Sequence, residues 1–118
     1  QRIQFGHPII AIQAVQHMLA DMATQVEAAR ALVYATARTV DAGVKNVSQE
    51  SAMAKVFASD VAMKVTVDAI QVMGGAGFMR DYPVEKMMRD AKITQIYEGT
   101  NQVLRNVIAQ ELWKRKGN

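Results

Sequence analysis

The amino-acid sequence predicts an all-α domain, an antiparallel up-and-down bundle of the four-helix type. Half of the residues are hydrophobic whereas only 6% are aromatic, and this balance favours helices over a β-sandwich. Apolar residues recur at steps of three and four over long stretches, and only two prolines, Pro8 and Pro83, occur in the chain. A chain of 118 residues is long enough for one domain with its own hydrophobic core.

The first helix is predicted over residues 10–40. Polar and charged residues occupy the face opposite its apolar positions, which is the pattern of a long amphipathic helix. Gly43 then provides a stop signal. The apolar positions are Val15, Met18, Leu19, Met22, Val26, Ala29, Val33, Ala37 and Val40.

A second helix is predicted over residues 49–73. Ser48 offers an N-cap, and Glu50 adds a negative charge to the first turn, where the helix dipole favours it. The glycine-rich segment 74–77 ends this helix. Its apolar positions are Met53, Val56, Phe57, Met63, Val67 and Ile70.

Two shorter helices follow. Residues 83–89 are predicted to form one of them, with Pro83 in its first turn, and a connector runs from Ala91 to Gly99. Thr100 or Asn101 then caps a last helix that extends to residue 116. The buried face of this last helix is predicted to contain Val103, Val107, Ile108, Leu112 and Trp113.

None of these helices can hide its apolar face alone, which predicts antiparallel packing at crossing angles of about 20°. A fourth full-length helix is not visible in the sequence. We therefore expect one of two arrangements: residues 1–6 are the stub of a truncated first helix, or a partner supplies the missing wall of the bundle. The chain begins with Gln1 rather than Met, which predicts a fragment or a processed product.

Composition excludes several classes of function. The net charge of +3 is spread along the chain except at residues 114–116, which argues against a nucleic-acid-binding surface. The absence of cysteine excludes a disulfide scaffold and a thiolate site, and His7 and His17 share no metal-ligand spacing with carboxylates. No apolar run approaches the roughly 20 residues that a membrane-spanning helix needs.

Glu98 is the leading candidate for catalysis. Hydrophobic neighbours at Ile93, Ile96 and Tyr97 would shield it from water, and loss of water raises the pKa of a carboxyl group. Such a group can remove a proton next to a carbonyl. The alternative is a solvated carboxylate before a helix N-terminus, and spacing alone favours this alternative because structural carboxylates outnumber catalytic ones.

Three further segments have two interpretations each. The glycines of segment 74–77 permit close approach of a phosphate or ribose, or simply end a helix; the Rossmann fingerprint is excluded because its third glycine and its strand are missing. Thr100, Asn101 and Gln102 cap a helix or form an anion or carbonyl site. Arg2 clamps a phosphate or is a solvated end residue, and the solvated interpretation is favoured without further context.

Together these segments resemble the C-terminal helical domain of acyl-CoA dehydrogenases, over residues 1–118. The short-chain, medium-chain and butyryl-CoA members resemble the chain most. The resemblance also includes Arg2-Ile3-Gln4-Phe5-Gly6 and Ile96-Tyr97-Glu98-Gly99-Thr100. Its most specific part is Gln71-Val72-Met73-Gly74-Gly75-Ala76-Gly77-Phe78-Met79-Arg80-Asp81-Tyr82-Pro83-Val84-Glu85-Lys86, followed by Arg89-Asp90-Ala91-Lys92.

The resemblance implies a flavoenzyme of fatty acid β-oxidation that desaturates an acyl-CoA thioester between its α and β carbons. Glu98 matches the family's catalytic base and would take the pro-R α-proton while the β-hydrogen leaves as hydride to FAD. The N–H of Glu98 and a flavin ribityl hydroxyl would polarise the thioester carbonyl. Exclusion of water by the substrate would bring the pKa values of the base and the α-carbon closer together.

The resemblance also implies the cofactor and substrate contacts. Thr100 and Gln102, with Asn101 alongside, would contact the FAD of their own subunit, and Tyr97 and Gly99 would line the acyl pocket. The FAD held mainly by a neighbouring subunit would be contacted by Arg2, Gln13, Gln71, Val72, Met73, Gly74 and Gly75.

The implied partners are an electron-transfer flavoprotein and further copies of the chain in a homotetramer or dimer, in the bacterial cytoplasm or the mitochondrial matrix. The family's N-terminal helical domain and middle β-domain are not represented, so we expect the isolated chain to be inactive. Glu98 argues against the isovaleryl- and long-chain-type members, which place the base elsewhere. Two alternatives stay open: a non-catalytic helical assembly module, and a related acyl-CoA oxidase or carnitine-ester-type CoA reductase.

Overall fold

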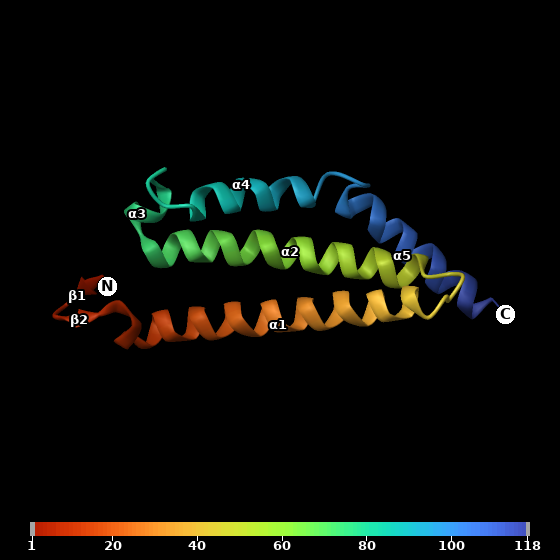
Figure 1. The fold of residues 1–118 in the computed structure, drawn as a ribbon, viewed down its shortest axis with the longest axis horizontal. Helices are drawn as coiled ribbons and strands as arrows, with labels where there is room; N and C mark the ends of the chain where they lie inside the picture. The colour runs from red at the N-terminus through yellow and green to blue at the C-terminus, as the bar shows by residue number, and fades with distance from the viewer. Residues whose placement is uncertain (1, 118) are drawn as a thin grey trace.

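The computed structural model describes residues 2–117 and confirms the all-α class (Figure 1). The helices are preceded by a short antiparallel hairpin, whose strands β1 and β2 have two residues each, and by a 3-10 turn over Ile9–Ala11. The strands are β1 Ile3–Gln4 and β2 His7–Pro8, and the helices are α1 Gln13–Asp41, α2 Ser48–Met73, α3 Gly75–Phe78, α4 Val84–Thr94 and α5 Asn101–Lys116.

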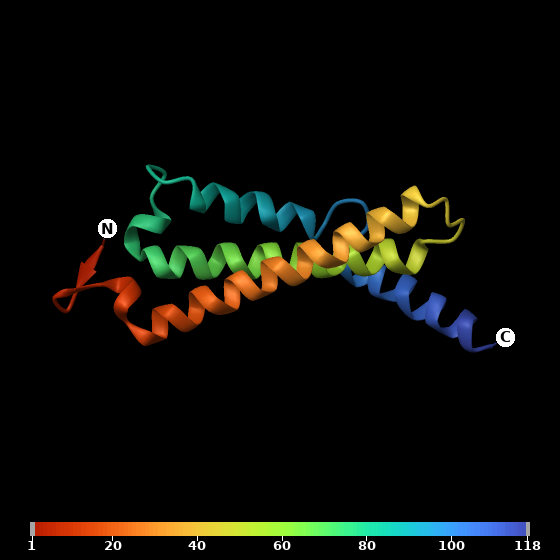
Figure 2. The ribbon, with the colours of Figure 1, turned by 60° about the horizontal axis from the view of Figure 1, so that its bottom comes forward.

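Helix α2 is the central element of the molecule. Helix α1 packs along one side of it and α4 along the opposite side, while α5 runs obliquely from the end of α4 across α2 (Figure 1). Figure 2 shows that α1 runs obliquely across α2. The extents are 63 × 25 × 25 Å and the radius of gyration is 18.0 Å. A compact domain of this length would have a radius of gyration of about 13.5 Å, so the helices form an elongated bundle.

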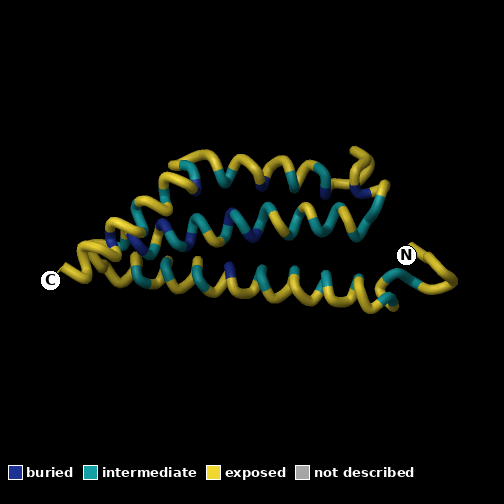
Figure 3. Tube along the Cα trace, turned by 180° about the vertical axis from the view of Figure 1, so that it is seen from behind, coloured by how far each residue is buried: buried dark blue, intermediate teal, exposed yellow. Residues whose placement is uncertain are grey.

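The core between these helices is thin and consists mainly of small side chains. Alanine at the contacts allows the helix axes to approach closely, but it buries little apolar area per residue. The buried residues lie mainly on the inner faces of α2, α4 and α5, and α1 and α3 contribute one each (Figure 3). The buried apolar residues are Ala29, Ala52, Ala54, Val61, Val84 and Ala91.

Several predicted core positions are wrong for this chain because no described element packs over them. Trp113 on α5 is 80% exposed, and Val103 on the same helix is 52% exposed. Helical periodicity identifies an apolar face but not whether the same chain covers it. The other large residues predicted to be buried and found exposed are Val33, Val40, Phe57, Val67 and Leu112.

The chain ends and connectors also correct the sequence prediction. Residues 3–8 form a hairpin rather than the stub of a helix, with Phe5 and Gly6 at positive φ in its turn. Helix α4 continues to Thr94, so the connector to α5 begins later than expected. The segment after Gly74 forms the single helical turn α3 instead of an irregular turn.

Two helix starts differ in how their caps work. Ser48, the predicted cap, is the first residue of α2, and its N–H donates instead to Asn46 Oδ1 at 3.2 Å. The predicted cap at Thr100 is confirmed, because its Oγ1 accepts a hydrogen bond from the N–H of Val103 at 3.2 Å.

Within residues 2–117 no helix combines the length and apolarity required to cross a bilayer, and no three histidine or acidic side chains gather as metal ligands would.

Candidate functional site

Glu98 lies in the connector between α4 and α5, in a left-handed backbone conformation. Its φ is 54°, and Gly99 after it has a φ of 89°. A glutamate rarely adopts positive φ because its Cβ crowds the backbone, and such conformations cost about 1–3 kcal/mol and cluster at functional sites. The surrounding contacts must therefore hold this turn in place.

Contacts from α2 and from both flanking helices hold the turn. Lys55 Nζ donates to the carbonyl of Gly99 at 2.8 Å and to Asn101 Oδ1 at 2.7 Å. The N–H of Asn101 donates to the carbonyl of Gln95 at 3.0 Å. The start of α5 is thus attached to the last turn of α4 and to the middle of α2, which leaves the Glu98 segment little freedom.

A polar cluster beneath the turn completes this attachment. We call Lys55, Ser59, Asp60, Gln95, Asn101 and Arg105 the Asp60 cluster. Asn101 is only 3% exposed, and its Nδ2 donates to Ser59 Oγ and to Asp60 Oδ1, both at 2.8 Å. Gln95 Nε2 donates to Asp60 Oδ1 at 2.9 Å, and Arg105 pairs with Asp60 Oδ2 at 2.8 Å. Both polar atoms of the Asn101 side chain and its main-chain N–H are thus engaged within the chain, and its cofactor contact stays a prediction.

The cluster shifts the ionisation of Asp60. Burial opposes the charged form of this carboxyl group and raises its pKa, but hydrogen bonds from Asn101, Gln95 and Arg105, together with the charge of Arg105, outweigh burial. The net result is a pKa below the ordinary value of 3.8. Asp60 is therefore a carboxylate that serves as an acceptor for the turn.

Residues that flank the turn line two hollows, and Glu98 itself lines neither of them. The apolar one, of about 240 Å³, is lined by Lys55, Ser59 and Tyr97 together with Ala58, Ala62 and Thr94. The polar one, of about 440 Å³, is lined in part by Thr100, Asn101 and Gln102. The structure thus brings the predicted flavin contacts of α5 into one hollow and the predicted acyl contact Tyr97 into the other, with Glu98 between them in the chain.

The chain alone does not shield Glu98 from water as the sequence suggested. Glu98 is exposed, and its neighbours Ile93, Ile96 and Tyr97 are each about half exposed, at 49%, 48% and 53%. Among the described residues the N–H of Glu98 has no hydrogen-bond acceptor. The carboxylate and this N–H are both available to a molecule that approaches the turn.

A second group of predicted residues lies at the other end of α2. Arg2 Nη1 donates to the carbonyl of Met73 at 2.5 Å, and its guanidinium occupies the space that a Cβ on Gly74 would need. Gly74 has a φ of 65° and a ψ of −147°, which only glycine adopts readily. A guanidinium beside bare backbone is chemistry that suits a phosphate group.

The remaining predicted residues of this second group share that end of the molecule. Gln13 begins α1, Gln71 and Val72 lie in the last turn of α2, and Gly75 follows, with open space where its Cβ would be. Lys55 and Gly74 are separated by about 28 Å along α2 at 1.5 Å per residue. A single copy of the chain therefore keeps the two predicted cofactor groups apart.

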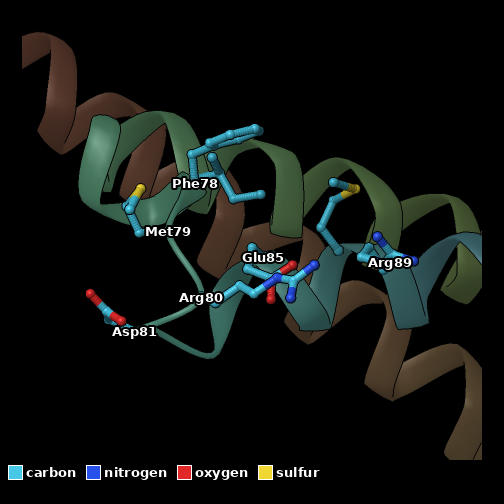
Figure 4. A pocket seen from close by; sticks show the side chains of 8 residues that line it. Phe78, Met79, Arg80, Asp81, Glu85 and Arg89 are labelled. Carbon is cyan, nitrogen blue, oxygen red and sulfur yellow. The ribbon is translucent and has the colours of Figure 1, made fainter.

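A larger hollow lies elsewhere, between α3, the following loop and α4 (Figure 4). Its volume is about 530 Å³, and its lining includes Arg80, Glu85 and Arg89. None of the predicted site residues lines it. Size alone therefore does not identify the candidate site in this chain.

Sequence reasoning missed the residues that support Glu98. Lys55 and Ser59 lie four residues apart on the stripe of α2 that also carries Ala52, and Asp60 follows directly. Polar side chains at helical spacing on an otherwise small-residue buried face were the available signal. Arg105 gave no comparable signal, because an arginine on a helix surface is ordinary.

Comparisons with known proteins match this chain along nearly its whole length. The family model described as acyl-CoA dehydrogenase, C-terminal domain, matches residues 1–113. An acyl-CoA dehydrogenase of Bacillus subtilis (strain 168) is 55% identical over 112 residues, which are 95% of this chain and 29% of that protein.

Two solved structures agree with these matches. Butyryl-CoA dehydrogenase from Megasphaera elsdenii superposes with a TM-score of 0.92 at 51% identity, over 96% of this chain and 29% of that chain. A chain in a structure of the electron transferring flavoprotein of Acidaminococcus fermentans gives a TM-score of 0.91 at 59% identity, over 94% and 29%. Structures that match also include FAD complexes. The chain thus spans about three tenths of the length of these relatives.

Proposed function

This chain belongs to the acyl-CoA dehydrogenase family, as its C-terminal domain, and we propose that it supplies the catalytic base of such an enzyme. The reaction is the α,β-desaturation of an acyl-CoA thioester, and Glu98 is the base. The observation that carries the proposal is the left-handed backbone at Glu98, which directly follows Tyr97 of the apolar hollow and lies two residues before Thr100 of the polar hollow. Strain of this kind persists only where the surrounding structure maintains it.

The family is FAD-dependent, and the residues present fit that cofactor. Arg2 and the bare backbone at Gly74 offer a guanidinium and an uncrowded main chain, which suit a pyrophosphate. Thr100 and Gln102 offer hydroxyl and amide groups to the polar edge of a flavin. The distance between these two groups supports the expectation that each contacts a different FAD, one of its own subunit and one of a neighbour.

In the proposed mechanism the Glu98 carboxylate removes the α-proton of the bound thioester. Its own N–H, which has no acceptor in the described chain, donates to the thioester carbonyl and stabilises negative charge there. FAD held in part by Thr100 and Gln102 would supply the acceptor for the β-hydrogen, which leaves as hydride. Tyr97 and Gly99 position the acyl chain, and the substrate excludes water from Glu98, which favours proton transfer.

Further surfaces are needed to complete the site. The apolar hollow of about 240 Å³ is smaller than the roughly 300–1,000 Å³ typical of ligand pockets. Exposed apolar side chains on α1 and α5 support assembly with other copies in a dimer or tetramer. We therefore propose that the 118 residues alone are inactive; turnover of butyryl-CoA by the isolated chain would contradict this.

The partner that takes the electrons is proposed to be an electron-transfer flavoprotein. This rests on the family and on the similarity to a chain from the Acidaminococcus fermentans structure. Bacterial relatives favour the cytoplasm over the mitochondrial matrix. An acyl-CoA oxidase is the competing enzyme, and rapid reaction of the reduced full-length protein with oxygen would favour it.

The proposal is tested by Glu98→Gln in the full-length protein, with Glu27→Gln on α1 as a control for loss of an exposed carboxylate. We expect turnover to fall by about 10²- to 10⁴-fold for Glu98→Gln, as for loss of a general base. FAD absorbance should stay unchanged, and the control should keep full activity. Unchanged turnover in Glu98→Gln would reject the proposal and favour a non-catalytic assembly module.

A further inference from the structure

Lys55 connects the middle of α2 to the turn that carries Glu98. Its Nζ donates to the carbonyl of Gly99 and to Asn101 Oδ1, at 2.8 and 2.7 Å. These acceptors lie one and three residues after Glu98. Neither the sequence pattern nor the proposed mechanism assigns a role to this lysine.

The bond to Gly99 bears directly on the strained part of the backbone. Glu98 and Gly99 have successive positive φ values, and the Gly99 carbonyl is at the end of that pair. A cation bound to this oxygen fixes the orientation of the peptide group that follows Gly99. Because charge-assisted hydrogen bonds are about twice as strong as neutral ones, this contact can offset the cost of the strained conformation.

The second hydrogen bond joins Lys55 to Asn101, whose side chain is itself fixed by other hydrogen bonds. Asn101 is 3% exposed, and its Nδ2 is held by Ser59 and Asp60 on the same helix as Lys55. Its Oδ1 is therefore aimed at Lys55 by contacts that do not involve the turn. Lys55, Asn101 and Asp60 thus form a relay of contacts from the body of α2 to Gly99.

We propose that Lys55 is a positioning residue for Glu98: it holds the left-handed turn so that the carboxylate and the N–H of Glu98 face the substrate together. Lysine suits this task because its ammonium has three donors and no acceptor, and two of the donors reach oxygen atoms on either side of Thr100. This inference rests on the proposed role of Glu98 as the base.

The test uses the full-length protein with Lys55→Met, which keeps an unbranched side chain one atom shorter and removes the three donors. We expect kcat to fall on the order of 10- to 100-fold, the cost of a misplaced catalytic group, with KM and FAD content unchanged. Lys55→Arg should recover part of the loss because it keeps charged donors. Lys64→Met is the matched control, since Lys64 lies on the same helix and pairs with Asp68 at the surface.

A double variant separates positioning from a merely structural role. In a Glu98→Gln background, Lys55→Met should cause no further fall in the residual turnover, because a residue that acts through Glu98 has nothing left to position. An equal fall in both backgrounds would overturn the proposal, as would a kcat for Lys55→Met that matches Lys64→Met. If Lys55→Met fails to fold, Lys55→Gln provides the same comparison with an amide in place of the ammonium.

The two proposals fail in different ways. If Glu98→Gln retains full turnover, the base assignment is wrong and the positioning role falls with it. If Glu98→Gln is inactive while Lys55→Met has normal kcat, only the positioning role is overturned.

Discussion

The two ends of helix α2 carry the two groups of predicted site residues, and they are built in opposite ways. Toward its N-terminal half, the Asp60 cluster ties α2 to α4 and α5 through a nearly buried Asn101. At its C-terminal end, Arg2 makes one hydrogen bond to a carbonyl, and the bare backbone of Gly74 and Gly75 lies beside it. The first region is satisfied by its own chain, whereas the second offers binding groups to another molecule.

This difference shows which parts of the candidate site are held in place by contacts within a single copy of the chain. The turn around Glu98 is fixed by contacts within one copy of the chain, so its geometry does not require a partner. The Gly74 end is instead proposed to be completed by a further molecule, a neighbour's FAD. Variants at the first end should therefore act mainly on stability and turn geometry, and variants at the second end mainly on cofactor binding and assembly.

The largest stability effect is expected for Asn101→Leu in the full-length protein. Leucine has a similar size but leaves Ser59, Asp60 and Lys55 without their shared partner. Buried polar groups that lose a partner cost about 1–3 kcal/mol each, so we expect a loss of about 3 kcal/mol. Thermal unfolding followed by circular dichroism measures it.

Asn106→Leu is the control for this variant, since Asn106 is exposed on the same helix. It should shift the unfolding midpoint little. A similar small shift for Asn101→Leu would mean that the Asp60 cluster does not stabilise the fold, and the contrast between the two ends of α2 would disappear.

A smaller effect is expected at the other end for Gly74→Ala. Alanine at a φ of 65° and a ψ of −147° is strained by about 1–3 kcal/mol, and its Cβ would displace the guanidinium of Arg2. We expect lower FAD content in the purified protein in addition to a lower unfolding midpoint. Flavin absorbance per subunit measures the first quantity.

Gly75→Ala is the matched control for Gly74→Ala, because a Cβ at Gly75 meets nothing within 4 Å and the residue lies in the helical turn α3. It should leave stability unchanged or slightly higher. Because Gly75 is itself a predicted FAD contact, this control applies to stability alone, and an unchanged FAD content in Gly74→Ala would contradict the proposed role of the Gly74 end.

Much of the fold was predictable from the sequence because helical periodicity and caps are local signals. Residues 49–73 and the cap at Thr100 agree with α2 and α5 within one residue. The exposure of Trp113 and Val103 was not predictable, because burial depends on what covers a face and not on the face itself. The support of Glu98 by Lys55 was equally hidden, since residues 44 positions apart meet only once α2 and α5 pack together.

Helix capping provides a third comparison, of about 1 kcal/mol. Thr100→Val removes the hydroxyl that accepts the N–H of Val103 at 3.2 Å and should lower the unfolding midpoint accordingly. Ser48→Ala is its counterpart at the start of α2, where Ser48 makes no such cap, so we expect almost no change. A larger effect at Ser48 than at Thr100 would contradict the caps described above.

The smallest expected effect is the pH dependence contributed by Asp60. Its folded-state pKa lies below the ordinary 3.8, so its contribution to stability is complete above that pH and is lost as the pH falls through the folded pKa. The Asp60 side chain is 38% exposed, so solvent screening should keep the contribution to about 1 kcal/mol or less. Urea unfolding midpoints of Asp60→Asn and the unaltered protein should therefore differ at pH 6 and converge in acid.

Asp21→Asn on α1 is the control for the loss of an exposed carboxylate. If the two urea midpoints differed by the same amount at every pH, Asp60 would stabilise the turn through its hydrogen bonds and not through its charge.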